Sequence, residues 1–433
     1  MKKFHVLATA LAAAAFLAGC GGNDAGDQSP RVAFTQMVNF GDSLSDVGSY
    51  KTAIVGANGG GHYSINGDFK ASGLLYTNWT EYLAAQLQLT QPCAAEVGLA
   101  SVGALAFLAQ TPVDSTTCLS YAQGGSEVTD PHGPGNAYLY TTYGSTSGQL
   151  GQLTKPVHDQ IATYLAGHTS FTDSQLITVL AGGNDLFIDR ALTVDAHVQG
   201  ILQAEQAGQI DAATAATMIA AAAQAAVDQM TLAGQQLADL VKTQIIANGG
   251  KHVVVVNLPN VALTPDNALW VTTGAGVYVE PVHPHLTLDM TNAFNTALAT
   301  GLSVTAAGNG NQSSSLPEVA WVDAFTANTD QATNPTAYGL TNVTTPACKL
   351  DGTAGSTGLT VPTSATTTTF VPLASSLFCT ANTLIATDTA NVTATDATGL
   401  LHYEFADTVH PTPFAYRLLA ELVGEQMAIK GWL

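Results

Sequence analysis

The sequence predicts an α/β fold in which helices flank a central parallel sheet. Strand-like and helix-like segments alternate along most of the chain, which is typical of this class. The strand-like segments are short and almost wholly apolar, as strands covered on both faces are. Hydrophobic residues make up 46% of the 433 residues and charged residues only 10%, so the chain can bury a large core.

The first half of the chain supplies two predicted strands and two predicted helices. Residues 34–40 are a mainly apolar run that Gly41 ends, and residues 175–180 (QLITVL) are a second run that ends before a glycine pair. Residues 76–89 and 155–167 instead have apolar side chains at helical spacing. We therefore expect the order strand, helix, helix, strand.

The second half continues the alternation. A long helix rich in Ala and Gln is expected at residues 211–248, where two glycines stop it. Residues 252–258 (HVVVVNL) are the clearest buried strand, and a second strand is expected at 319–322. Helices are expected between these strands at 286–301 and at the end of the chain at 412–430.

Two stretches interrupt the alternation. Residues 90–150 are rich in Gly, Ser and Thr, and residues 325–400 are rich in Thr, Asn and Ala. We interpret both as long loop excursions of a single domain at residues 34–433, not as separate domains. In open α/β sheets the ligand site lies at the carboxyl ends of the strands, so such excursions are expected to shape it.

The start of the chain is typical of a targeting segment. Two lysines precede an apolar run at residues 6–16, which is too short to span a membrane. The run leads to the letters LAGC, ending at Cys20, and this resembles a bacterial lipoprotein signal. We predict removal of residues 1–19, lipidation of Cys20 and a flexible tether at 20–33. This interpretation predicts an exported protein that is anchored to the outer membrane by its lipid. The alternative interpretation is an ordinary signal peptide that is cleaved without lipidation.

The charge balance excludes one class of partner. Lys and Arg total 12 against 32 Asp and Glu, which gives a formal net charge of −20. Nucleic-acid binders need a basic face to replace the counterions of the phosphates, so a nucleic-acid partner is not expected. Electrostatic attraction to anionic lipid is disfavoured for the same reason.

Four cysteines remain besides Cys20, and four cysteines allow three pairings. For an exported protein we favour the two local disulfides, which are Cys93–Cys118 and Cys348–Cys379. A metal site is the alternative, but no two of these cysteines have the short spacing that is typical of zinc ligands.

The stretch VNFGDSLSD raises a question about Ser43. Ser and Asp are frequent helix N-caps, so Asp42 and Ser43 could simply start a helix after the strand. A serine acts as a nucleophile only where a base removes its proton, an acid orients that base, and donors stabilise the oxyanion. We interpret Asp42 as a structural capping acid.

Four short motifs occur in order: GDSL at 41–44, YAQGGS at 121–126, AGGNDL at 181–186 and DTVHP at 407–411. Together they resemble the ordered motifs of the GDSL, or SGNH, hydrolase family over about residues 34–430. The resemblance implies a three-layer α/β/α fold of flavodoxin-like type. It also implies a catalytic site that needs neither cofactor nor metal.

The resemblance implies a role for each of five residues. Ser43 matches the nucleophile, His410 the general base, and Asp407 the acid that orients the imidazole. The oxyanion hole would consist of the backbone N–H groups of Ser43 and Gly125 and the side chain of Asn184. These donor types suit the task, because glycine allows close approach to the backbone and an amide is a neutral donor.

The implied activity is that of a serine esterase or lipase working through an acyl-serine intermediate. Its substrates would be lipid or short-chain acyl esters, lysophospholipids included. A carbohydrate O-acetylesterase or an acyltransferase of the same fold is the alternative. A surface lipoprotein that only binds is disfavoured, because a binder does not need all five residues. The oligomeric state is left open.

A second acid-x-x-His pair, Glu280 and His283, competes with Asp407 and His410, and His285 follows it. It lies in an insert rich in Pro and Gly, and we expect no helix directly after it, in contrast to His410. His283 and His285 could also bind a metal, but no cluster of carboxylates or cysteines completes such a site.

Overall fold

The computed structural model describes residues 31–306, 312–353, 355–362, 367–385 and 398–433. The predicted signal segment 1–19, the lipidation site Cys20 and most of the tether 20–33 lie outside the described residues, so these remain predictions.

A four-stranded parallel sheet forms the centre of the fold, in the order β1–β4–β5–β8. Its strands are β1 (Gln36–Gly41), β4 (Gln175–Leu180), β5 (Val253–Val256) and β8 (Val319–Val322). Every residue of β4, β5 and β8 is buried, as the apolar runs predict. The predicted α/β class with a central parallel sheet is confirmed.

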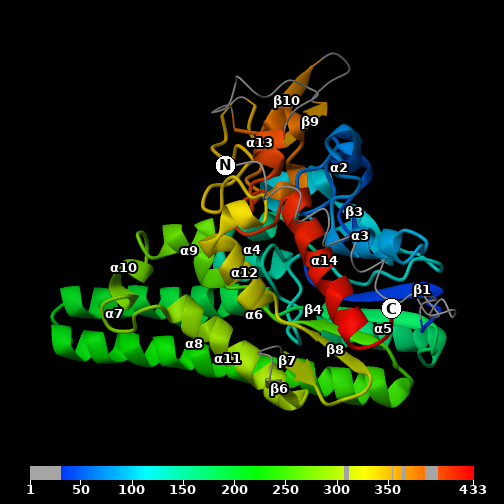
Figure 1. The fold of residues 1–433 in the computed structure, drawn as a ribbon. Coiled ribbons are helices and arrows are strands. Elements are labelled where there is room, and N and C mark those ends of the chain that lie inside the picture. The colour runs from blue at the N-terminus through cyan, green and yellow to red at the C-terminus, as the bar shows by residue number, and fades with distance from the viewer. Residues whose placement is uncertain (1–30, 307–311, 354, 363–366, 386–397) are drawn as a thin grey trace, which may run out of the picture.

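Helices cover both faces of the sheet (Figure 1). Because side chains alternate along a strand, Val253 and Val255 face one helical layer while Val254 and Val256 face the other. The first layer consists of α5 (Val157–His168), α8 (Ala212–Leu240) and α11 (Leu286–Gly301). The second consists of α3 (Trp79–Gln86) and α14 (Pro413–Ile429).

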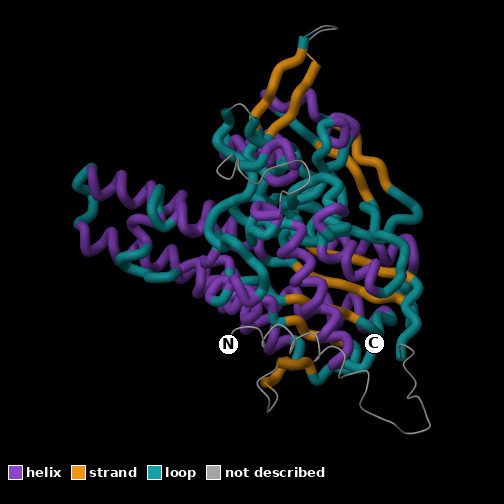
Figure 2. Tube along the Cα trace, turned by 45° about the horizontal axis from the view of Figure 1, so that its top comes forward, coloured by secondary structure: helices purple, strands orange, loops and turns teal. Residues whose placement is uncertain are grey.

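The long predicted helix is α8, which continues through a π-helical turn and a 3₁₀ turn to Asn248. Together with α11 and the unpredicted α7 (Ala196–Gln206), it extends beyond the sheet as a helical lobe (Figures 1 and 2). The shorter helices are α2 (Ala53–Ala57), α4 (Ala137–Tyr143), α6 (Gly183–Ile188), α9 (Pro265–Trp270), α10 (Gly276–Val279), α12 (Ala324–Thr333) and α13 (Thr398–Leu401). No helix in the described ranges is long and apolar enough to cross a membrane.

An irregular segment extends the sheet beyond β1. The N–H of Asn39 donates to the carbonyl of Leu119 at 3.0 Å, and Tyr121 N–H donates back to Asn39 at 2.8 Å. Gln123 N–H then donates to the carbonyl of Gly41 at 3.1 Å. This pairing brings the glycines that follow Gln123 to the carboxyl end of β1.

The two excursions contain strands that the sequence did not predict. The first has the antiparallel pair β2 (Glu96–Leu99) and β3 (Gln110–Asp114), and the second has β9 (Gly358–Pro362) and β10 (Thr368–Pro372). The disulfides are Cys93–Cys118 and Cys348–Cys379, the local pairing that the sequence favours. Each disulfide therefore closes a loop within one excursion.

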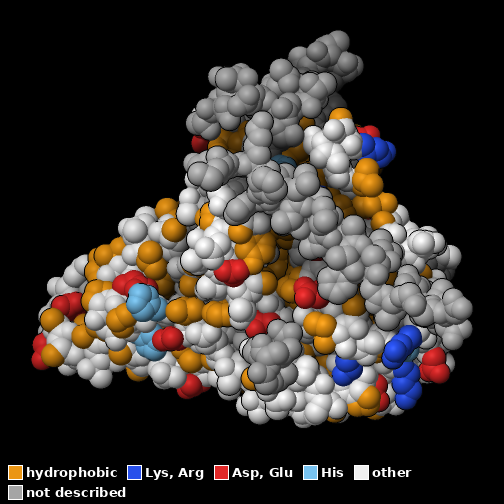
Figure 3. All heavy atoms as spheres, in the orientation of Figure 1, with side chains coloured by type: hydrophobic (Ala, Val, Ile, Leu, Met, Phe, Trp, Pro, Cys, Tyr) orange, Lys and Arg blue, Asp and Glu red, His pale blue; other side chains and the backbone are white. Residues whose placement is uncertain are grey.

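On the face shown in Figure 3, the Lys and Arg side chains of the described residues lie in small groups toward one edge. The acidic side chains are more widely spread. This distribution agrees with the charge balance of the sequence and offers no broad basic surface there.

Candidate active site

Ser43 lies in a tight turn directly after β1. Gly41 makes the turn possible: its φ is +148°, and a Cβ there would lie 2.1 Å from the carbonyl oxygen of Leu180 on β4. The Asp42 carboxylate accepts the N–H of Leu44 at 2.9 Å and so stabilises this turn. The expectation that Asp42 caps a helix is wrong, because the next helix, α2, begins only at Ala53. The serine is 8% exposed and borders a cavity.

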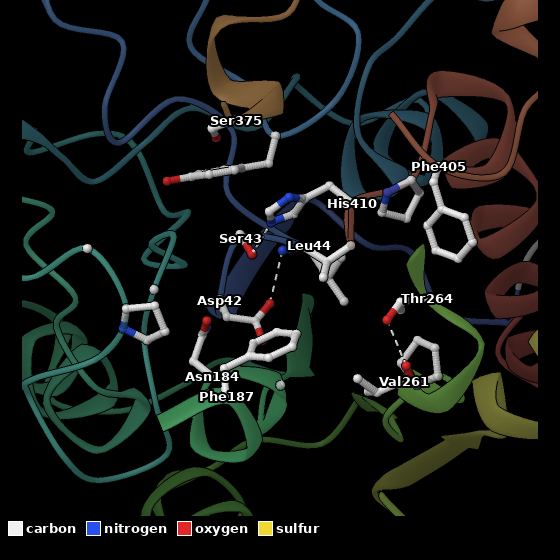
Figure 4. Close-up of a pocket in the computed structure, with 18 of the residues that line it drawn as sticks. Asp42, Ser43, Leu44, Asn184, Phe187, Val261, Thr264, Ser375, Phe405 and His410 are labelled. Atoms are coloured by element: carbon white, nitrogen blue, oxygen red, sulfur yellow. Dashed lines mark hydrogen bonds between the residues drawn. The ribbon is translucent and has the colours of Figure 1, made fainter. Parts of the chain in front are cut away.

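The structure brings Ser43, His410 and Asp407 together (Figure 4). His410 Nε2 lies 2.8 Å from Ser43 Oγ, and His410 Nδ1 lies 2.8 Å from Asp407 Oδ2 and 2.9 Å from Oδ1. One imidazole thus connects a hydroxyl and a carboxylate, each within hydrogen-bond distance. This is the geometry that transfers a proton from serine to histidine.

Asp407 is held in place by its backbone neighbours. Its Oδ1 accepts the N–H groups of Val409 at 2.9 Å and His410 at 2.8 Å, while Oδ2 accepts Ser376 N–H at 2.7 Å. Burial alone raises the pKa of this carboxyl. The charge and hydrogen bonds of His410, together with the Val409 N–H, outweigh burial and lower the pKa well below its usual range. Asp407 is therefore ionised.

Tyr63 packs against His410 on the cavity side. The two ring centroids are 4.8 Å apart with a tilt of 34°. The Tyr63 hydroxyl contacts the side chain of Gln152, and the Tyr63 carbonyl accepts the hydroxyl of Tyr416 at 3.2 Å. The aromatic ring therefore limits rotation of the imidazole. Sequence reasoning missed Tyr63, because it belongs to none of the four motifs.

Ser43, Gly125 and Asn184, the three residues expected to form the oxyanion hole, line the same cavity. Within the described residues, neither Ser43 N–H nor Gly125 N–H has a hydrogen-bond acceptor. Asn184 Nδ2 donates one hydrogen to the carbonyl of Ser126 at 2.9 Å, which orients the amide and leaves its second hydrogen for a ligand. Gly125 has a φ of +82°, and a Cβ there would lie 2.4 Å from the carbonyl oxygen of Pro134.

Asp46 connects the serine turn to the glycine pair. Its Oδ1 accepts the N–H groups of Gly48 at 2.8 Å and Ser49 at 2.7 Å, and its Oδ2 accepts Gly124 N–H at 2.9 Å. Asp46 therefore fixes the position of Gly125 relative to Ser43. In the sequence, this role of Asp46 was indicated only by the presence of an acid three residues after Ser43.

Asp185, next to Asn184, holds the backbone that follows Gly125 and Ser126. Its two carboxylate oxygens each lie 3.2 Å from the N–H of Val128. Burial raises the pKa of Asp185 to about 7, and burial likewise raises the pKa of Asp42 to about 7. Both carboxyls accept backbone donors, so they support the site structurally.

The competing histidine lies elsewhere. His283 Nε2 lies 3.2 Å from Asp289 Oδ2, in a separate concavity between α8 and α11. The expectation that no helix follows this histidine is wrong: α11 begins at Leu286, three residues later, as α14 begins three residues after His410. What distinguishes the two histidines is therefore their position: His410 contacts Ser43 Oγ, whereas His283 lies in a different concavity. The described ranges contain no group of three or more His, Cys, Asp or Glu that could hold a metal ion.

A cavity of about 550 Å³ opens beside Ser43 and His410. Most of its lining is apolar, and both excursions contribute to it. The apolar residues nearest the sheet and α14 are Leu44, Phe187, Leu258, Val261, Val409, Leu419 and Leu422. Leu105, Pro134 and Leu150 come from the first excursion, and Pro372, Leu373 and Phe378 from the second. Such a lining fits a hydrocarbon chain.

We expect Asn184→Leu to lower kcat for an ester about 10²- to 10³-fold, because the predicted oxyanion hole would lose one neutral donor at nearly constant side-chain volume. Steady-state kinetics on a nitrophenyl ester measure the effect. The melting temperature is recorded in parallel, since the bond to Ser126 is lost too. A variant that folds normally and keeps kcat within a few-fold would exclude Asn184 from the oxyanion hole.

The disulfide Cys348–Cys379 holds the backbone that contacts Asp407, because Ser376 lies three residues before Cys379. Replacing both cysteines by alanine is expected to lower kcat about tenfold through loss of the Ser376 N–H contact. The matched control is the Cys93/Cys118 double alanine variant. Cys348–Cys379 joins residues 31 positions apart and Cys93–Cys118 joins residues 25 positions apart, so the two closed loops are similar in length.

On the chain-entropy account, each disulfide contributes about 3.5 kcal/mol to the free energy of unfolding. Both variants should therefore melt at lower temperatures by similar amounts. Assays well below both transitions compare kcat alone. Equal kcat values in the two variants would mean that the second disulfide contributes stability only.

A protein-family model described as GDSL-like lipase/acylhydrolase matches residues 37–423. The matched region contains all four motifs and the five residues discussed above. A search among curated proteins gave no match.

Proposed function

The chain belongs to the GDSL-like lipase/acylhydrolase family, which implies an ester hydrolase, and from this premise we propose that it cleaves acyl esters through an acyl intermediate on Ser43. The observation that carries the proposal is the position of His410, within 2.8 Å of both Ser43 Oγ and Asp407 Oδ2. Asp407 acts as the orienting acid because its carboxylate is ionised and buried.

The proposed reaction has two halves. Ser43 Oγ attacks the ester carbonyl while His410 Nε2 takes its proton. The N–H groups of Ser43 and Gly125 and the amide of Asn184 donate to the oxyanion. His410 then protonates the leaving alcohol. A water gives a proton to His410 as its oxygen attacks the acyl carbonyl, and His410 returns that proton to Ser43 Oγ as the acid leaves.

The apolar cavity supports a lipid or other acyl ester as substrate, with the acyl chain packed against the side chains from α14. Lysophospholipids belong to this class. A carbohydrate O-acetylesterase or an acyltransferase is the second candidate, since the same acyl-serine intermediate serves all three. A binder without activity is disfavoured, because binding alone requires no hydroxyl bonded to an imidazole.

Two further proposals concern location. We propose that residues 1–19 are removed, that Cys20 is lipidated, and that residues 20–33 tether the domain at 34–433 to the outer membrane. The two disulfides support export, because such bonds persist in oxidising compartments. A membrane-anchored enzyme lies close to lipid esters, which agrees with the proposed substrate class.

A substrate panel tests the proposal. It contains nitrophenyl esters from acetate to palmitate, a lysophospholipid and an acetylated sugar. We expect turnover of the nitrophenyl esters, with a rise in kcat/KM from acetate to longer chains because the cavity is apolar. A fluorophosphonate should label Ser43. Absence of both turnover and labelling would overturn the proposed function, and acetate esters as the best substrates would favour the second candidate.

A further inference from the structure

The aromatic ring of Tyr63 contacts two parts of the candidate site at once. Its centroid lies 4.8 Å from that of the His410 imidazole. The same ring packs on the backbone of Gly124, because a Cβ added to that glycine would lie 2.3 Å from Tyr63 Cε2 and Oη, closer than van der Waals contact allows. The next residue is Gly125, whose N–H is a proposed oxyanion donor. One side chain therefore lies against both the proposed base and the glycine pair Gly124–Gly125.

The hydroxyl of Tyr63 reaches the second glycine through Gln152, which donates to it from Nε2. A Cβ on Gly125 would lie 3.1 Å from Gln152 Oε1, so the buried Gln152 side chain packs against that glycine. The Gly124 carbonyl accepts the hydroxyl of Tyr50 at 2.6 Å, and the Tyr50 ring packs edge-on against Tyr63 with centroids 6.3 Å apart. The ring and its neighbours thus fix the glycine pair from one side.

The chain next to Tyr63 is fixed to the other end of the site. Ser64 Oγ donates to the carbonyl of Pro411 at 3.0 Å, directly after the proposed base. Asn66 is 4% exposed, and its Nδ2 donates to the carbonyl of Ser376 at 3.1 Å, the residue whose N–H contacts the orienting acid. None of these contacts uses the aromatic ring. A change confined to the Tyr63 side chain therefore leaves them in place.

We propose that Tyr63 is a positioning residue, which aligns the His410 imidazole with the oxyanion donors by packing against both the imidazole and the glycine pair. The inference rests on the proposed esterase function and deepens it by adding a residue outside the four motifs. A displacement of about 1 Å at a catalytic group can lower a rate about 100-fold. A tyrosine that only fills space would instead affect stability, with no specific effect on kcat.

The first test compares Tyr63→Leu with Tyr63→Phe on a nitrophenyl ester, well below the melting temperature of each variant. Tyr63→Leu should lower kcat about 10- to 100-fold and leave KM within a few-fold, because the ester still binds while the base and the donors are misaligned. Tyr63→Phe keeps the ring, so its kcat should stay within a few-fold of wild type.

Tyr82→Leu is the matched control. It removes the same atoms from a buried tyrosine on α3 that does not line the cavity. We expect a lower melting temperature and a kcat within a few-fold of wild type. A loss of kcat in Tyr63→Leu alone would therefore reflect the position of the ring, whereas equal kcat values in the two leucine variants would contradict the proposal.

The second test uses Gly124→Ala, which keeps Tyr63 intact. Unlike Gly125, Gly124 does not have a positive φ, so its backbone accepts alanine. The new methyl group would collide with the Tyr63 ring and should lower kcat at least about tenfold by displacing it. Leucine lacks the Cε2, Cζ and Oη atoms that this methyl group meets. The double variant Gly124→Ala/Tyr63→Leu should therefore be no less active than Tyr63→Leu.

The remaining outcomes are also decisive. A folded Tyr63→Leu variant with wild-type kcat, or a Tyr63→Phe variant as impaired as Tyr63→Leu, overturns the role of the ring. Losses that add up in the double variant overturn the link to the glycine pair. If Tyr63→Leu does not fold, wild-type kcat in Gly124→Ala overturns that link instead. A wild-type enzyme that does not hydrolyse the ester would count against the proposed function.

Discussion

Replacing Ser43 by alanine should lower kcat for ester hydrolysis by about 10⁴- to 10⁶-fold, since the proposed acyl intermediate forms on the Ser43 hydroxyl. The fold should be unaffected, because within the described part of the chain the lost oxygen is hydrogen-bonded to His410 alone. Steady-state kinetics on a nitrophenyl ester measure the loss, and a fluorophosphonate followed by peptide mapping measures the labelling at Ser43.

Ser45→Ala is the matched control. It removes the same atom two residues further along the same turn, where the hydroxyl accepts Trp79 Nε1 at 3.2 Å and does not line the cavity. This variant should keep kcat within a few-fold of wild type. Retained hydrolysis and labelling in Ser43→Ala would show that another residue is the nucleophile.

His410→Ala should cost about as much as Ser43→Ala, because the serine is a weak nucleophile without its base. Residues that act as one unit lose activity non-additively, so the double variant should be little worse than either single variant. The kcat values of the three variants, measured on one ester, test this directly.

His283→Ala is the control for position, because His283 has the same acid-x-x-His spacing but borders a separate concavity. Its kcat should stay within a few-fold of wild type, and a small change in melting temperature is expected from the lost contact with Asp289. Inactivity of His283→Ala together with activity of His410→Ala would refute the proposed base.

The sheet and its helices were largely predictable from local pattern. β4, β8 and α11 occupy the residues predicted from their apolar runs and helical spacing. The strand pairs of the excursions were not predictable, because β10 is largely exposed and β3 contains a proline, so neither has the apolar pattern of a buried strand. α7 was missed as well, in a stretch with few large apolar residues.

The candidate site divides in the same way. The motifs pointed to Ser43 and His410, because their chemistry depends on residue type and on position at a strand or helix end. No motif pointed to Ser376 or Tyr63. The contact of Ser376 with Asp407 and the packing of Tyr63 against His410 depend on how distant loops fold back over the sheet, and such contacts are set by tertiary packing.

The contact between Ser376 and Asp407 also has a consequence for the timing of activity. The loop that provides this N–H is closed by Cys348–Cys379, a bond that cytosolic thiols keep reduced. If the disulfide is what holds Ser376 in place, as the cysteine variants test, a newly made chain lacks this donor to Asp407 until the cysteines are oxidised. Under the proposed export, oxidative folding would then act as a maturation step, and esters inside the cell would meet a less active form of the protein.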